Sequence, residues 1–166
     1  MDPCLRVLVA EDNVDDALLM QRAFKSQGLN NPLYIVTDGA EVIQYLKGEG
    51  AYNDRTTHPT PQMMILDLKM PRKNGFEVLQ WLLENRELNV IPTLIWSSSA
   101  DARDVKRAYC LGAHGYLVKP TDFQHFKKMV GDVMRYWEHC VKPSPEDALP
   151  PCSELNGKGP LSQTSH

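Results

Sequence analysis

Several features that would direct a functional assignment are missing from this chain of 166 residues. The four cysteines, Cys4, Cys110, Cys140 and Cys152, follow neither a CxxC nor a zinc-site spacing, so we expect reduced thiols and no disulfide framework. No apolar run is long enough to cross a membrane, and the N-terminus lacks the pattern of a signal peptide. The net charge of −3 provides no broad basic surface for nucleic acid. We therefore expect a cytoplasmic protein that binds neither membranes nor nucleic acids.

The chain does contain short apolar segments that alternate with stretches of helical periodicity. The apolar segments predict strands at residues 5–10, 33–37, 63–67, 93–97 and 115–118. The periodic stretches predict helices at residues 14–27, 39–47, 75–87, 100–111 and 121–141. Apolar strands that are joined by helices are typical of a parallel sheet covered on both faces. We therefore predict a flavodoxin-like α/β fold, a doubly wound five-stranded parallel sheet with strand order 2-1-3-4-5.

Two segments lie outside this alternation. Residues 48–62 form a polar loop that is longer than most connections, which indicates either a function or mobility. Residues 142–166 carry five of the twelve prolines, and this composition predicts a disordered tail after a domain of residues 1–141. A tail of this length cannot form a second folded module, so we expect output through protein partners.

Carboxylates follow two of the predicted strands, and these strands are neighbours in the predicted sheet. Glu11 and Asp12 come after the first strand, and Asp67 ends the third. Clustered carboxylates need a cation to stay ionised together, and hard oxygen ligands suit Mg²⁺. Glu11 and Asp12 can also be read as the polar start of a helix, with Asn13 as its N-cap.

A hydroxyl and an ammonium group are predicted at the same edge of the sheet. Ser97 ends the fourth strand, and Lys119 follows the fifth. Taken alone, Ser97 can be a helix cap and Lys119 a solvated surface lysine. Together with the three carboxylates, they form a set that suits phosphoryl transfer to a carboxylate, because a hydroxyl and an ammonium both bind phosphoryl oxygens.

Four segments resemble, in order and in spacing, the receiver domain of two-component response regulators. They are LVAEDN, ILDLKMPRKNGFEVL, IPTLIWSSS and GAHGYLVKP, and the resemblance covers residues 5 to about 140. It implies that Asp67 is the phosphoacceptor. It also implies that Glu11, Asp12 and Asp67 bind Mg²⁺ together with the backbone carbonyl of Lys69.

The resemblance also implies how the domain signals. Ser97 would be the switch hydroxyl, Tyr116 the switch aromatic residue and Lys119 the partner of the phosphoryl group. The donor would be a sensor histidine kinase or a histidine phosphotransfer protein, and the chain would not itself be an enzyme. The segment EDNVDDALLMQRAF and the long loop resemble small stand-alone regulators, some of which are paired with bacterial phytochrome kinases.

Three alternatives to this resemblance are open. A phosphatase or phosphotransferase with a nucleophilic Asp usually has a second Asp two residues later, and that position is Lys69 here. A flavin or dinucleotide module needs a Gly/Ser/Thr-rich loop after the first strand, where this chain has acidic residues. A scaffold with a degenerate site remains an alternative, although none of the expected site residues is absent.

The last predicted helix suggests an association surface. Its core-facing stripe is predicted to consist of Phe123, Phe126, Val130, Val133 and Trp137. Apolar or aromatic residues also occupy the neighbouring faces, namely Met129, Tyr136 and Cys140. Since exposed apolar patches often mark association sites, we expect a homodimer contact through this helix, with simple packing on the sheet as the alternative.

Overall fold

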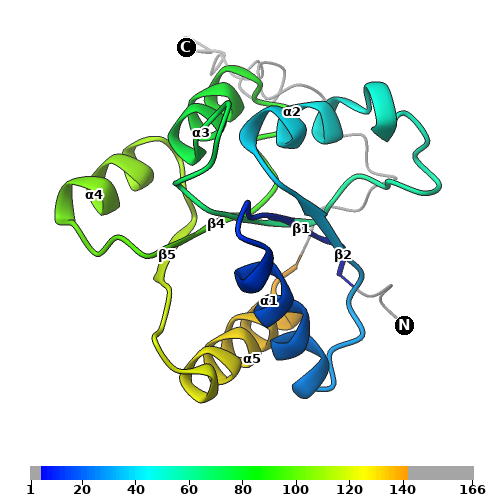
Figure 1. Ribbon diagram of the computed structural model, residues 1–166. Helices are drawn as coiled ribbons and strands as arrows, with labels where there is room; N and C mark the ends of the chain where they lie inside the picture. Colours follow the sequence, from blue (N-terminus) through cyan, green and yellow to red (C-terminus); the bar gives the residue numbers. More distant parts are fainter. Residues whose placement is uncertain (1–4, 142–166) are drawn as a thin grey trace, which may run out of the picture.

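The five apolar segments form the strands of one sheet in the computed structural model, which describes residues 5–141 (Figure 1). The strands are β1 (Val7–Ala10), β2 (Leu33–Val36), β3 (Met63–Leu66), β4 (Thr93–Ser97) and β5 (Gly115–Val118). All neighbouring strands are parallel, and their order is β2-β1-β3-β4-β5. The predicted doubly wound fold is therefore confirmed. The predicted tail, residues 142–166, lies outside the described residues.

Helices cover both faces of this sheet (Figure 1). They are α1 (Val14–Ser26), α2 (Gly39–Lys47), α3 (Gly75–Glu84), α4 (Ala102–Cys110) and α5 (Phe123–His139). α1 and α5 pack together on one face, where Val9, Phe24 and Met134 are buried in one cluster. α2, α3 and α4 cover the other face, where Leu8 and Leu79 belong to a second cluster. Adjacent residues of β1 therefore point into different cores, as the pleat of a strand requires.

Side-chain caps explain where several helices begin. The Asn13 side chain accepts hydrogen bonds from the backbone N–H groups of Asp15 and Asp16, so Asn13 is the N-cap of α1. Asn74 and Glu77 form a reciprocal capping box at the start of α3. The predicted helix bounds are correct at these starts. In residues 5–141, every helix is too short or too polar to span a lipid bilayer.

In α1 and α5, the buried face matches the apolar spacing along the sequence only in part. In α1, Ala17 and Phe24 are buried, whereas Val14 is 72% exposed and Leu18 46% exposed. In α5, the predicted stripe does face the core, where Phe126 and Val130 are buried and its other members are partly buried, and Met134 is buried in addition. The reason is that α1 and α5 pack against each other as well as on the sheet, which turns their apolar faces toward a shared contact.

The long loop at residues 48–62 is folded back onto α2. It contains the 3₁₀ helix η1 (Gly50–Tyr52), and Arg55 donates hydrogen bonds to the carbonyl groups of Tyr45 and Leu46. These carbonyls end α2, so the guanidinium satisfies acceptors that a helix leaves unpaired. The Tyr45 hydroxyl donates to the Pro59 carbonyl at 3.1 Å. Hydrogen bonds therefore attach the loop to α2 and hold its two ends together.

Candidate functional site

The carboxyl ends of the strands lie at one edge of the sheet, and the side chains selected from the sequence meet there. β1 leads directly into Glu11 and Asp12, and β3 leads into Asp67. Ser97 is the last residue of β4, and Lys119 follows β5. The Lys119 N–H donates to the Ser97 carbonyl at 2.8 Å, which extends the pairing of the two strands up to the site. Five predicted site residues are therefore neighbours at this edge.

Three carboxylates form the centre of the site. Glu11, Asp12 and Asp67 each offer one oxygen, and these oxygens lie within 4.8 Å of one another. Glu11 and Asp67 are buried, whereas Asp12 is exposed. Burial raises the pKa of Glu11 to about 7, although hydrogen bonds from Lys119 and from the Asn13 N–H act in the opposite direction. A divalent cation would favour the ionised form, and oxygen donors of this kind fit Mg²⁺ or Mn²⁺.

Lys119 provides the positive charge of the site. Its Nζ lies 2.7 Å from Glu11 Oε2, 2.8 Å from Asp16 Oδ2 and 3.3 Å from Asp67 Oδ2. Burial alone would lower the pKa of Lys119, but hydrogen bonds to Asp16 and Glu11 raise it above its ordinary value. The lysine is therefore a fixed cation beside Asp67, and the interpretation of a solvated surface lysine is wrong.

Ser97 and Tyr116 are linked through the loop between β4 and α4. The Ser97 side chain is fully buried, and its Oγ accepts a hydrogen bond from the Ser99 N–H at 3.1 Å. The Tyr116 hydroxyl donates to the Ser99 carbonyl at 2.9 Å. The Ser99 hydroxyl in turn donates to Asp104 Oδ2 at 2.6 Å. A change at the Ser97 hydroxyl can therefore reach both Tyr116 and α4 through Ser99.

The β3–α3 loop, residues 67–75, is held against the starts of α2 and α3. A Cβ at Gly75 would lie 2.4 Å from the Asp67 carbonyl oxygen, so only glycine allows this approach. Arg72 has a φ of 60°, and its guanidinium donates to the buried carboxylate of Asp38. The Lys69 side chain is exposed, and the backbone nitrogen of Lys69 lies 3.4 Å from Asp67 Oδ1. The conformation of this loop is thus fixed by contacts on both sides of Lys69.

Sequence reasoning missed three residues that contact the site or the loop beside it, namely Asp16, Asp38 and Arg72. Asp16 contacts Lys119 across 103 positions in the chain, and Asp38 contacts Arg72 across 34. Asp16 and Asp38 lie at the starts of helices, where an acidic residue already has a local explanation. Their second partners come from other strands and loops, so only the fold reveals them.

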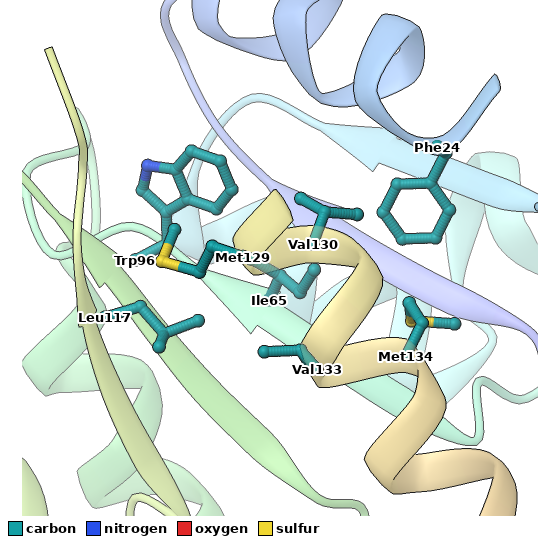
Figure 2. Close-up of a pocket in the computed structure, with 8 residues that line it drawn as sticks. All are labelled: Phe24, Ile65, Trp96, Leu117, Met129, Val130, Val133 and Met134. Carbon is teal, nitrogen blue, oxygen red and sulfur yellow. The ribbon is translucent and has the colours of Figure 1, made fainter. Parts of the chain in front are cut away.

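An apolar pocket lies between α5 and the sheet (Figure 2). Trp96, Leu117, Met129 and Val133 are among its lining residues, which are all apolar or aromatic. The pocket offers no groups for polar chemistry, and we assign it to the core. Met129 points into it, so this side chain packs inward and is only partly exposed (Figure 2).

Comparisons with known proteins agree with this geometry. The family model described as the response regulator receiver domain matches residues 7–131. The chain belongs to this family. Receiver domains act in phosphorylation-based two-component signalling, and they are generally signalling proteins. The resemblance seen in the sequence is therefore confirmed.

Individual receiver domains are similar over most of their length. Response regulator Rcp1 of Synechocystis sp. is 31% identical over 135 residues, which are 81% of this chain and 90% of Rcp1. The structure of Mn²⁺-bound Rcp1 has a TM-score of 0.76 and covers 86% of this chain and all of Rcp1. The response regulator RPA3017 in red-light signalling of R. palustris has a TM-score of 0.80 at 29% identity, covering 84% of this chain and 99% of RPA3017. The phosphorylated cyanobacterial phytochrome response regulator RcpA has a TM-score of 0.78 at 28% identity, covering 86% of this chain and all of RcpA.

Proposed function

We propose that Asp67 accepts a phosphoryl group from the phosphohistidine of a sensor histidine kinase or of a histidine phosphotransfer protein. The observation that carries the proposal is the position of Asp67, a buried carboxylate between two further acidic side chains and the ammonium group of Lys119. Charge neutralisation and positioning are the main requirements for phosphoryl transfer. The site provides both around a single candidate nucleophile.

The proposed step is an in-line displacement at phosphorus. An Asp67 carboxylate oxygen forms a bond to phosphorus while the bond from phosphorus to the histidine nitrogen breaks, and the imidazole leaves with its electron pair. Lys119 then pairs with a phosphoryl oxygen in place of its bond to Asp67 Oδ2. Ser97 donates its hydroxyl hydrogen bond to another phosphoryl oxygen, since a hydroxyl can serve as donor or acceptor.

We propose Mg²⁺ as the cofactor, held by the carboxylates of Glu11, Asp12 and Asp67 and by the backbone carbonyl of Lys69. The set of hard oxygen donors supports this choice. The similarity to Rcp1, which is known in a Mn²⁺-bound form, supports a divalent cation in this chain as well. When bound, the cation would neutralise charge on the phosphoryl oxygens and on the three carboxylates.

We further propose that phosphorylation switches the β4–α4 loop. When the Ser97 hydroxyl turns toward the phosphoryl group, it gives up the Ser99 N–H that it binds now. The Ser99 carbonyl also anchors Tyr116, so movement of this loop releases the tyrosine ring to turn inward. Output then passes to protein partners through the surface that these residues form.

The partner that donates the phosphoryl group has a surface to bind beside the site. Val14 and Leu18 are exposed on α1 one helical turn apart, and α1 begins directly after Asp12 and Asn13. Exposed apolar residues of this kind support contact with a helix of a kinase or of a phosphotransfer protein. RPA3017 acts in red-light signalling and RcpA is a phytochrome response regulator, and the similarity to both supports a kinase of the bacterial phytochrome type. We propose that the transfer takes place in the cytoplasm, where ATP is available to the kinase.

We also propose a homodimer contact through α5. Tyr136 is 65% exposed, and its ring lies 5.4 Å from that of Trp137, which packs against the core. Met129 contributes less than its sequence position indicated because it packs into the apolar pocket. Sedimentation should give a dimer for the wild type and a monomer for Tyr136→Glu. A wild-type monomer at high micromolar concentration, with and without a phosphoryl mimic, would exclude the dimer.

Acetyl phosphate provides the direct test of the proposed chemistry. With Mg²⁺ present, the wild type should gain one phosphoryl group, and Asp67→Asn or the removal of Mg²⁺ by chelation should abolish the gain. Asp12→Asn serves as a comparison, because it alters the metal site and keeps the nucleophile. Labelling of Asp67→Asn at the wild-type level would show that the assignment is wrong.

A further inference from the structure

Asp16 is a fourth carboxylate at the site, and neither the proposed metal site nor the proposed phosphoryl transfer gives it a role. It lies in the first turn of α1, and its side chain is 34% exposed. Its Oδ2 is 2.8 Å from Lys119 Nζ. Asp15, next to it in the same helical turn, is exposed and makes no side-chain hydrogen bond or ion pair within residues 5–141. Favourable interaction with the helix dipole applies to both residues, so it does not account for the contact of Asp16 with the lysine.

The three ion pairs of Lys119 differ in what else their carboxylates can bind. Glu11 and Asp67 both belong to the group of carboxylates that can hold a metal ion, and Asp16 does not. A metal ion and the ammonium group are therefore two cations that compete for Glu11 and Asp67. An ammonium group has three N–H donors, and here each one is directed at a different carboxylate.

We propose that Asp16 is a positioning residue that holds Lys119 at the α1 side of the site, away from Asp67, and so leaves Asp67 available to the divalent cation. The contacts of Lys119 Nζ to Glu11 and Asp16 are short, at 2.7 and 2.8 Å, whereas its contact to Asp67 is longer, at 3.3 Å. The lysine is thus drawn toward α1 and remains within reach of the position where the phosphoryl group arrives. Without Asp16, Lys119 would bind Asp67 more closely and oppose the metal there. This inference rests on the proposed metal site.

The test is calorimetric titration with MgCl₂ at moderate salt, so that long-range charge effects are screened. Asp16→Asn should weaken Mg²⁺ binding by about threefold to fivefold, the upper part of the range for an exposed ion pair. Asp15→Asn is the matched control, because it makes the same charge change in the same helical turn, and its effect should be about twofold or less. Asp16→Glu keeps a carboxylate within reach of Lys119 and should restore most of the wild-type affinity.

A second arm shows whether Asp16 acts through the lysine. Lys119→Gln should tighten Mg²⁺ binding, and adding Asp16→Asn to it should have no more effect than adding Asp15→Asn. In phosphorylation by acetyl phosphate, Asp16→Asn should raise the Mg²⁺ concentration needed for half-maximal rate. Its rate at saturating Mg²⁺ should stay within about twofold of the wild type, because only the competition has changed.

The outcomes separate this inference from the proposed function. A wild type that binds no Mg²⁺ would contradict the metal site itself. If the wild type binds Mg²⁺ but Asp16→Asn and Asp15→Asn are equivalent, the metal site stands and the role of Asp16 is wrong. A loss in Asp16→Asn that persists in the Lys119→Gln background, or at saturating Mg²⁺, would also overturn it. Circular dichroism and thermal unfolding of each variant check that the fold is retained.

Discussion

The contact between Asp38 and Arg72 determines how firmly the β3–α3 loop is held, and its strength can be worked out from the structure. The Asp38 side chain is 2% exposed, caps α2 through the Glu41 N–H at 2.9 Å and accepts a bond from Arg72 Nε at 2.7 Å. Loss of an N-cap costs about 1 kcal/mol. Arg72 is 63% exposed, so its charge-assisted bonds contribute about 1 kcal/mol after solvent screening. Asp38→Ala should therefore reduce the free energy of unfolding by about 2 kcal/mol in urea denaturation.

Matched variants divide this value into its parts. Asp38→Asn keeps an oxygen that can cap α2 and should lose only about 1 kcal/mol. Arg72 has a φ of 60°, where a residue with a Cβ is strained, so Arg72→Gly should be more stable than Arg72→Ala by about 0.5–1 kcal/mol. The reasoning fails if Asp38→Ala lies within about 0.5 kcal/mol of the wild type, the usual range for a surface substitution. It also fails if the glycine variant is the less stable of the two.

Three further predictions concern the switch, the pH dependence of stability and the partner surface. In Ser97→Ala, a phosphoryl mimic should no longer shift the NMR signals of the Tyr116 ring, and a wild-type shift would show that the two residues are not coupled. The Nδ1 atom of His114 accepts a hydrogen bond from the Thr93 N–H at 3.1 Å, and burial lowers the pKa of His114. Its contribution to the free energy of unfolding is therefore fully present above the ordinary histidine pKa and is lost as the pH drops below it. The melting temperature of His114→Asn should accordingly change less than that of the wild type between about pH 7.5 and 5.5, and equal slopes would contradict this. Leu18→Glu should slow phosphotransfer from a cognate kinase on the order of tenfold while leaving acetyl phosphate labelling unchanged, and equal slowing with both donors would argue against a docking role.

Local sequence was sufficient for the fold and for most of the site. Continuous apolar segments such as residues 63–66 are typical of a strand that is buried on both faces of a sheet. Parallel strands then place the residues that follow them at one edge of the sheet. Asp67, Ser97 and Lys119 could therefore be placed together without coordinates. Helix starts were also readable, because a cap such as Asn13 acts on N–H groups only two and three residues away.

The sequence was a poor guide wherever a side chain has two possible partners. Val14 and Leu18 follow an apolar spacing, but α1 turns its other face to α5 and leaves them exposed. Arg55 occurs in a polar loop that looked unanchored, and its partners are carbonyl groups, which leave no trace in side-chain patterns. Asp16 has a local role at a helix start that conceals its contact with Lys119. Such contacts depend on how elements pack, and spacing along the chain does not encode them.

The most direct test of the central claim is to locate the phosphoryl group chemically. The protein is phosphorylated by acetyl phosphate in the presence of Mg²⁺ and treated with borohydride, which reduces an aspartyl phosphate to homoserine. Peptide mass spectrometry then identifies the altered residue. We expect homoserine at position 67 alone, absent without Mg²⁺ and absent in Asp67→Asn. Homoserine at another position, such as 12 or 16, or none at 67 despite incorporation of phosphate, would contradict the assignment of Asp67 as the phosphoacceptor.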